Sequence, residues 1–337
     1  MTTPSVSVIV PNYNHAPYLT ERIRSILDQS FTDFELIILD DASTDNSREI
    51  IESFRSEPRV AHIIFNEKNN GILTAQWKKG LDQARGKWVW IAESDDTAHP
   101  DFLSEFFTCL QSNPDLDLFF CDSKATRPLD GGFTFASERR NTVFATTKWN
   151  SSYITNGRAE LNEALKYDCT INNLSAAVFR KSRLNEILDV ALPYRYYADW
   201  YLYIQVAAKG KICYSNKAYN NYRVHPASLL GAKTSSVTSK TEYFRILQSL
   251  LDKPFITEKQ DLLHHFCFNY LSVGLRSEGA VAIARILSGY CRLSPALALK
   301  VIWQIVMIKL FYRRYAALYS LDPANTDRKS CRHFVQS

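Results

Sequence analysis

The sequence predicts an α/β fold, with a mainly parallel central sheet covered by helices on both faces and a helical extension at the C-terminus. Short apolar runs rich in β-branched residues alternate with segments of helical periodicity between residues 5 and 121, as is typical of β-α-β units. Two of these runs end in acidic clusters, and no apolar run reaches the roughly 20 residues that span a bilayer. With 337 residues, 46% of them hydrophobic, the chain can form one large domain and an appendage.

The first part of the chain is expected to contain five strands separated by helices. The first strand, 5–10, is a β-branched run suited to burial on both faces. Pro11 breaks it, and a helix follows over 18–29. Asp45 and the hydroxyl residues before it offer caps for the second helix. The other strands are expected at 34–39, 60–65, 87–92 and 116–121, and the helices between them end near 54, 84 and 111.

The second part is less regular. Residues 127–149 are rich in Gly, Thr and aromatic residues, which predicts a loop or an irregular insertion. Beyond it, helices are expected at 157–167 and 197–208, and strands at 174–179 and 217–224. From residue 233 onward the pattern is helical again.

Charge and cysteine usage exclude several classes of protein. The formal net charge of +5 is small for this length, so a nucleic-acid partner is not expected. The seven cysteines are odd in number, widely spaced and without a CxxC pair, which indicates reduced thiols in a cytosolic protein and no zinc site. The N-terminus lacks the regions of a signal peptide, so a cytoplasmic location is expected.

An unusual concentration of charge follows the fourth strand, where Glu93, Asp95 and Asp96 lie within four residues. Such carboxylates repel one another and lose solvation where the fold packs around them, and a divalent cation or a hydrogen-bonding ligand would compensate them. The alternative is a solvated loop whose Asp caps the next helix. Asp41 lies at the end of the second strand. In parallel sheets, ligands bind at these carboxyl ends.

The familiar phosphate-binding motifs are absent. The chain has neither GxGxxG nor GxxxxGK[ST], so neither a dinucleotide-binding site nor a P-loop is supported. Carboxylates at strand ends can instead bind a nucleotide through its base and ribose, with the diphosphate held through a metal.

Four motifs together give the chain a family resemblance. They are Val8-Ile-Val-Pro-Asn-Tyr-Asn14, Leu39-Asp-Asp-Ala-Ser-Thr-Asp45, Asn70-Gly71 followed by Gln76-Trp-Lys-Lys-Gly80, and Ile91-Ala-Glu-Ser-Asp-Asp96. In this order and spacing the first 230 residues resemble the family 2 glycosyltransferases, which have the Rossmann-like GT-A fold. Nucleotidyltransferases share the sheet and the metal, but they usually have a Gly-rich loop where this chain has Pro11-Asn-Tyr-Asn14.

The resemblance implies roles for the residues that match the motifs. Pro11 and Tyr13 would lie against the nucleotide base, and Asp41 would accept a hydrogen bond from it, unless Asp41 only caps the next helix. Asp95 would contact the ribose, and Asp96 would coordinate Mg²⁺ or Mn²⁺ across the diphosphate. The family usually has Asp where this chain has Glu93, so a direct metal contact from Glu93 is not expected.

Three further residues carry the chemistry that the resemblance implies. Asp199, in Tyr196-Tyr-Ala-Asp-Trp-Tyr201, matches the family's catalytic base; the alternative is an exposed helical Asp. Arg223 and His225 match a segment that closes over the diphosphate, where the imidazole can ligate the metal. A structural role is the alternative for His225.

These expectations define domains and a function. Residues 1–232 would form the catalytic domain, with a nucleotide-binding half at 1–122 and an acceptor half at 123–232, and 233–337 would be helical. The resemblance implies an inverting hexosyl or N-acetylhexosaminyl transferase. It would move a sugar from a nucleotide-diphosphate sugar, with a UDP-sugar favoured, to a hydroxyl of a saccharide or lipid-linked acceptor, in bacterial surface polysaccharide or lipopolysaccharide assembly. A catalytically inactive sugar-nucleotide-binding subunit is the alternative.

The segment 296–315 joins an aliphatic stretch to basic residues. An interfacial helix at the inner face of the membrane is one interpretation. The other is a helix that packs in the core or between subunits of an oligomer.

Overall fold

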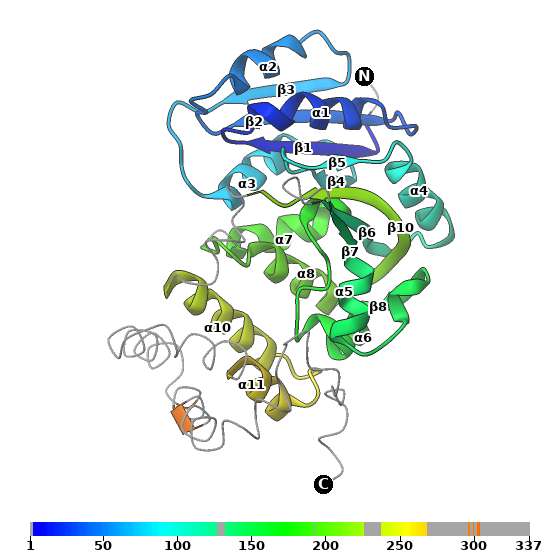
Figure 1. Cartoon of the computed structure of the whole chain (residues 1–337), viewed down its shortest axis with the longest axis vertical. Coiled ribbons are helices and arrows are strands. Elements are labelled where there is room, and N and C mark those ends of the chain that lie inside the picture. Colours follow the sequence, from blue (N-terminus) through cyan, green and yellow to red (C-terminus); the bar gives the residue numbers. More distant parts are fainter. Residues whose placement is uncertain are drawn as a thin grey trace.

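A computed structural model of the chain describes residues 3–126, 132–191, 193–225 and 237–267, together with four single residues near position 300. Its first part alternates strands and helices as the sequence predicts (Figure 1). The elements of this part are β1 (Val6–Asn12), α1 (Ala16–Leu27), β2 (Phe34–Asp40), α2 (Ser47–Ser53), β3 (Val60–Phe65), α3 (Leu73–Gln83), β4 (Trp88–Ile91), β5 (Thr97–Ala98), α4 (Phe102–Ser112) and β6 (Leu116–Thr126).

The second part is more regular than the sequence predicts. Its main elements are β7 (Phe133–Phe135), α5 (Ala136–Val143), β8 (Tyr153–Asn156), α6 (Gly157–Glu160), β9 (Ala177–Arg180), α7 (Lys181–Ala191), α8 (Ala198–Lys209), β10 (Lys211–Arg223), α10 (Val237–Leu251) and α11 (Lys259–Cys267). One turn of π-helix, Leu161–Leu165, continues α6, and two 3-10 turns lie at Lys148–Asn150 and Leu174–Ala176.

The expectation of a loop or irregular insertion over 127–149 is wrong for its described residues, which include β7 and α5. Long-range contacts explain why the local pattern is uninformative. The first turn of α5 is held by Asp122 of β6, which accepts hydrogen bonds from the backbone and hydroxyl of Ser137. Arg140, buried on the same helix, pairs with Asp122 at 2.7 Å.

Among the described residues the central sheet has ten strands, and four of the seven pairs along its main path are parallel. The strand order is β3-β2-β1-β4-β9-β6-β10-β5, with β7 beside β6 and β8 beside β10. Strands β3, β2, β1 and β4 run parallel, and β9 is antiparallel to both of its neighbours, β4 and β6. Asn12 of β1 is in register with Asp40 of β2, so the ends of these two strands lie together.

Helices cover both faces of the sheet because successive strand residues point to opposite sides. Val8 and Val10 join a core cluster with α1 and α4, whereas Ile9 joins a second cluster with α3, α7 and α8. On the second face, α3 approaches β1 so closely that a Cβ at Gly80 would lie 2.4 Å from the side chain of Ile9.

The described C-terminal helices share this second core. Tyr243 of α10 and Phe266 of α11 pack against Trp200 of α8. The two helices lie at the end of the molecule opposite α2 and β3 (Figure 1). The boundary at 232 stays a prediction, and apart from those four single residues, segment 296–315 lies outside the described residues. Within the part of the chain that the structure describes, no helix has both the length and the apolar character to cross a membrane.

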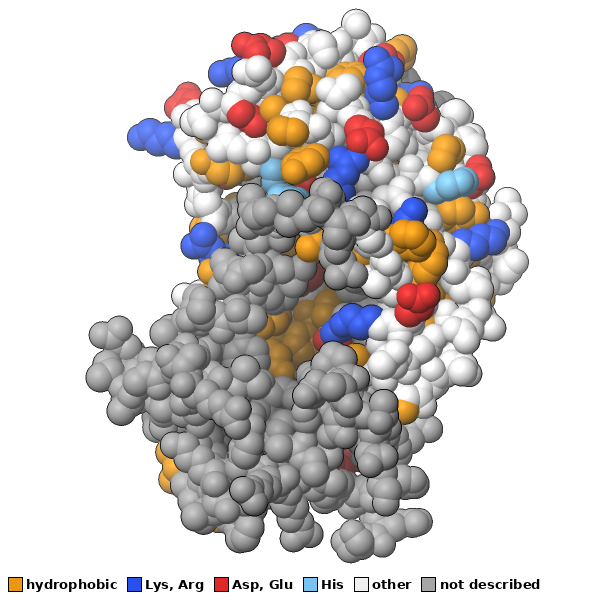
Figure 2. Space-filling view, in the orientation of Figure 1, with side chains coloured by type: hydrophobic (Ala, Val, Ile, Leu, Met, Phe, Trp, Pro, Cys, Tyr) orange, Lys and Arg blue, Asp and Glu red, His pale blue; other side chains and the backbone are white. Residues whose placement is uncertain are grey.

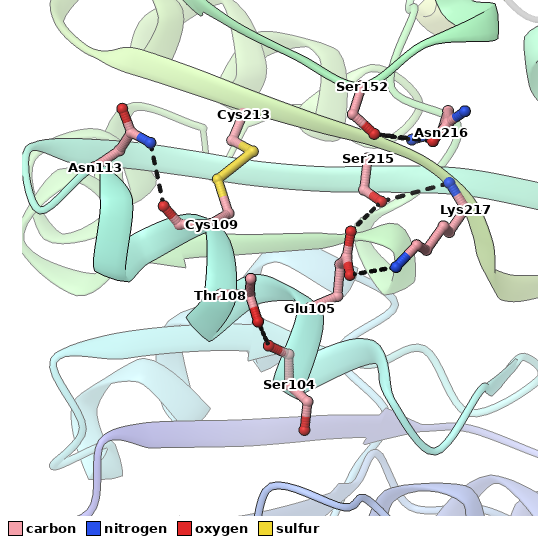
Figure 3. Close-up of a disulfide and its surroundings, with 10 residues drawn as sticks. All are labelled: Ser104, Glu105, Thr108, Cys109, Asn113, Ser152, Cys213, Ser215, Asn216 and Lys217. Carbon is pink, nitrogen blue, oxygen red and sulfur yellow. Dashed lines mark hydrogen bonds and ion pairs between the residues drawn. A yellow bond between two sulfur atoms is a disulfide. The ribbon is translucent and has the colours of Figure 1, made fainter.

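A disulfide joins Cys109 of α4 to Cys213 of β10 (Figure 3). The expectation that all seven cysteines are reduced is therefore wrong for this pair. The two residues are 104 positions apart, so sequence spacing gives no sign of their proximity. Near the disulfide, Glu105 of α4 accepts hydrogen bonds from Ser215 and Lys217 of β10, which also ties this helix to the strand.

We expect alkylation of the unfolded, oxidised protein to label two more cysteines after reduction than before it. The disulfide withholds Cys109 and Cys213 from the reagent, and a mass-spectrometric count of labels measures the difference. The variant Cys109→Ser should remove it. Equal counts with and without reduction in the unsubstituted protein would contradict the pairing.

Candidate active site

The candidate active site lies at the carboxyl ends of β1, β2 and β4, and the end of β10 reaches it from the other half of the sheet. The turn after β4 carries the acidic cluster. Asp96 there accepts a hydrogen bond from the backbone N–H of Arg223, at 3.1 Å, which joins this turn to β10. In Figure 2, hydrophobic side chains are visible in a hollow near the middle of the face shown, and a basic and an acidic side chain lie on one side of it.

Three potential metal ligands come together at this edge. One ligand atom from each of His15, Asp95 and His225 lies within 4.8 Å of the other two. His225 Nε2 is 3.0 Å from Asp95 Oδ2, and His15 Nδ1 is 2.8 Å from the hydroxyl of Ser94. A carboxylate with two imidazoles is a donor set that suits a divalent transition metal such as Mn²⁺. Among the described residues, this is the group of His, Cys, Asp and Glu that could hold such an ion.

The two histidines have opposite pKa shifts. Burial lowers the pKa of His15, with the charge of Asp95 acting against it. The hydrogen bond with Asp95 raises the pKa of His225. For Asp95 itself, burial acts to raise the pKa, but the hydrogen bond with His225 and the nearby charge of His15 outweigh it, so the pKa is lowered. Below the raised pKa of His225, its contact with Asp95 is therefore an ion pair.

Asp96 lies outside this cluster. Its carboxylate is fully buried and accepts hydrogen bonds from the side-chain amide of Asn173 and from the backbone of Arg223. Burial and the charge of Asp95 raise the pKa of Asp96 to about 7. The structure thus brings Asp95, and not Asp96, next to His225.

Glu93 is a further acid of this cluster with a raised pKa. Burial, followed by the charges of Asp95, Asp96 and Asp199, raises its pKa well above the ordinary value. Its backbone N–H donates to the hydroxyl of Ser175, just before β9. Glu93 is partly exposed, whereas Asp96 is fully buried.

Asp199 lies in the first turn of α8. It is half-buried, unlike the exposed helical Asp that was the alternative. Burial is the main cause that raises the pKa of Glu93 and of Tyr222, and the charge of Asp199 adds to the rise in both. A carboxylate is also favoured by the helix dipole in a first turn.

Asp41 forms a separate polar site at the end of β2. Its Oδ1 accepts hydrogen bonds from the side-chain amides of Asn66, at 2.6 Å, and Gln76, at 2.9 Å. The backbone N–H of Asn70 is 3.2 Å from both carboxylate oxygens. The first turn of α2 is served instead by Asp45, which accepts from the Ser47 backbone. Asp41 is therefore not the cap of this helix.

Pro11 and Tyr13 differ in exposure. Pro11 is buried within β1, whereas Tyr13 is 44% exposed and its ring is available to a ligand. Arg223 is already engaged on this side, because its guanidinium pairs with Glu21 of α1 and lies 5.2 Å from the ring centroid of Tyr18.

Sequence reasoning missed His15 and Asn173. His15 lies in the loop after β1, at the same edge as the acidic turn, so the rule that ligands bind at strand ends could have found it. Asn173 precedes an antiparallel strand that enters the sheet between β4 and β6, and no local pattern indicates its contact with Asp96.

The family model for glycosyl transferase family 2 matches residues 7–187. The chain belongs to this family. The matched region includes the motifs at β1, β2 and β4 and ends within α7.

Several relatives carry the same family name. The chain is 38% identical over 102 residues to the putative teichuronic acid biosynthesis glycosyltransferase TuaG of Bacillus subtilis, covering 30% of this chain and 40% of TuaG. It is 32% identical over 130 residues to the glycosyltransferase GlyG of Streptococcus pneumoniae, covering 39% of this chain and 42% of GlyG. The chain thus matches about two fifths of the length of these relatives.

Solved structures share the fold over nearly the whole chain. TarS residues 1–349 from S. aureus, crystallised with UDP-GlcNAc, superpose with a TM-score of 0.66 at 19% identity, covering 92% of each chain. The mannosyltransferase PcManGT from Pyrobaculum calidifontis, in complex with GDP-Man and Mn²⁺, gives 0.52 at 16% identity, covering 93% of this chain and 89% of that one. The protein therefore has the GT-A fold.

We expect His225→Asn to reduce the stability of the metal-free protein more at about pH 6 than at about pH 8.5. The partner Asp95 raises the pKa of His225 above 6.5. The contribution of the pair is therefore fully present below pH 6.5 and is lost as the pH rises through the raised pKa. Urea unfolding in EDTA at the two pH values measures this difference. A loss that does not change with pH would contradict the ion pair.

Proposed function

We propose that the protein is an inverting glycosyltransferase that moves a sugar from a nucleotide-diphosphate sugar to a hydroxyl of a saccharide or lipid-linked acceptor. The observation that carries the proposal is the cluster of His15, Asp95 and His225 at the strand ends, with Asp41 on one side and Asp199 on the other. A metal site, a base-binding carboxylate and a second carboxylate near the metal are the parts that such a transfer needs.

We propose that the cluster holds Mn²⁺ or Mg²⁺ through His15, Asp95 and His225. The metal role expected for Asp96 is thereby assigned to Asp95, because the Asp96 oxygens already accept hydrogen bonds from Asn173 and Arg223. Two nitrogen donors favour Mn²⁺, since Mg²⁺ takes mostly oxygen ligands. When bound, the ion would neutralise charge on the departing diphosphate.

The proposed base site contains Asp41 and the exposed ring of Tyr13. Within the described residues, the Oδ2 of Asp41 receives only the shared hydrogen bond from the Asn70 backbone, whereas Oδ1 also receives two side-chain amides. One open acceptor position matches a base that offers a single ring N–H between carbonyl groups, as uracil does. Guanine offers two adjacent N–H groups. This supports a UDP-sugar as donor.

Asp199 is the proposed general base. Its position in the first turn of α8 and the action of its charge on Glu93 support this role. Deprotonating the attacking hydroxyl while it displaces the diphosphate from the opposite face gives inversion. Arg223, at the end of β10, would contact the diphosphate after releasing Glu21.

The relatives suggest the biological setting. The name of TuaG refers to teichuronic acid biosynthesis, and on this basis we propose that the acceptor belongs to a bacterial cell-surface polysaccharide. A location at the inner face of the membrane stays a prediction.

We expect Asp199→Asn to lower kcat by about 10²- to 10⁴-fold, because the variant keeps the shape of the side chain but cannot take the proton. Donor binding, measured by calorimetry, should be unchanged. Asp189→Asn on α7 is a matched control, because its side chain is 68% exposed. Transfer by Asp199→Asn at the normal rate would exclude the base assignment. Absence of transfer and of donor hydrolysis in the unsubstituted protein would favour the inactive binding subunit.

With Mn²⁺ present, we expect UDP and UDP-sugars to raise the melting temperature more than GDP does. A ligand at about 100 times its Kd stabilises the folded state by about 2.7 kcal/mol, which thermal-shift assays detect. Asp41→Ala should remove the preference for the base. A shift from GDP as large as that from UDP would contradict the proposed base site.

A further inference from the structure

Arg22 is a fully buried charge that the proposed reaction does not use. It lies on α1 within the apolar stripe formed by Leu19, Ile23 and Ile26, and its side chain is 0% exposed. All three guanidinium nitrogens lack a hydrogen-bond partner among the described residues. A buried guanidinium without acceptors is costly to the folded state, so its presence calls for an electrostatic reason.

The surroundings of Arg22 supply that reason. Its guanidinium carbon lies 5.0 Å from the ring centroid of Trp90 in β4, a distance suited to a cation–π contact. Trp90 is two residues before the acidic turn begins at Ala92. Arg22 therefore lies beneath this turn, on the face of the sheet that α1 covers.

The charge of Arg22 interacts electrostatically with the acids of the turn. Burial lowers the pKa of Arg22 to about 10, and the charges of Asp96, then Asp95 and Glu93, oppose the lowering. The group stays protonated at neutral pH. The interaction works over distance, without a shared hydrogen bond.

We propose that Arg22 is a positioning residue whose fixed positive charge allows Glu93, Asp95 and Asp96 to be buried together at the metal cluster. Its significance for donor binding rests on the proposed function. The balance between the charge of Arg22 and the three carboxylates does not rest on the proposed function, and it can be measured without donor or acceptor.

A double-mutant cycle in EDTA tests this proposal. Arg22→Met keeps an apolar stem against Trp90 but removes the charge, and should lower the melting temperature by roughly 6–10 °C. Adding Asp96→Asn removes the strongest opposing charge and should restore at least half of that loss. Arg22→Lys keeps the charge and should lose less than half as much as Arg22→Met. Arg24→Met, an exposed position on the same helix, is the matched control and should have little effect.

Binding of Mn²⁺ alone gives a readout that a packing role would not change. Because Arg22 repels a cation bound at the neighbouring Asp95, Arg22→Met should bind Mn²⁺ several-fold more tightly, and Arg22→Lys should bind it as the unsubstituted protein does. Additive losses in the cycle, or a Lys variant as unstable as the Met variant, would overturn the proposal. If Arg22→Met does not fold, the proposal requires that Arg22→Lys folds and that the double variant Arg22→Met/Asp96→Asn folds. Failure of both to fold would overturn it. Failure here would leave the proposed transferase function standing.

Discussion

The burial of several carboxylates around the end of β4 is the constraint on which the site depends. Burial and the neighbouring acidic charges raise the pKa of both Glu93 and Asp96. The fold meets this cost in distinct ways. His225 pairs with Asp95. Asp96 accepts hydrogen bonds from Asn173 and from a backbone N–H, and Arg22 adds a buried positive charge. A divalent ion at the histidines would complete the compensation.

The topology of the sheet explains how these groups meet. Parallel strands β1, β2 and β4 bring three loops to one edge, and each loop carries polar groups that a buried strand interior could not hold. The insertion of β9 between β4 and β6 brings Asn173 and Ser175 under the acidic turn. The long strand β10 then delivers Arg223 and His225 from the far half of the sheet.

The motifs predicted much of this arrangement. Asp41, Asp95 and His225 lie at the strand ends where the motif spacing set them, because short β-α-β units leave little freedom in the position of a strand end. The division of roles within the acidic turn could not be predicted. Whether Asp95 or Asp96 points to the histidines depends on side-chain packing, which adjacent positions in a sequence do not encode.

Long-range contacts account for what the sequence did not indicate. Arg22 is visible only as a charge on the apolar face of a helix, and its purpose depends on an acidic turn more than 70 residues away in the chain. Asp122 stabilises α5 from a distant strand, and Cys109 meets Cys213 only because α4 packs on β10. None of these partners can be found from local periodicity.

The central claim is that a divalent ion binds among His15, Asp95 and His225. Electron spin-echo measurements on the Mn²⁺-loaded protein test it most directly, because they detect nitrogen nuclei bound to the metal. The account predicts nitrogen couplings from two imidazoles, one of which is lost in His15→Gln and the other in His225→Gln, with both retained in Asp96→Asn. A spectrum without nitrogen couplings, or one that neither histidine substitution changes, would contradict it.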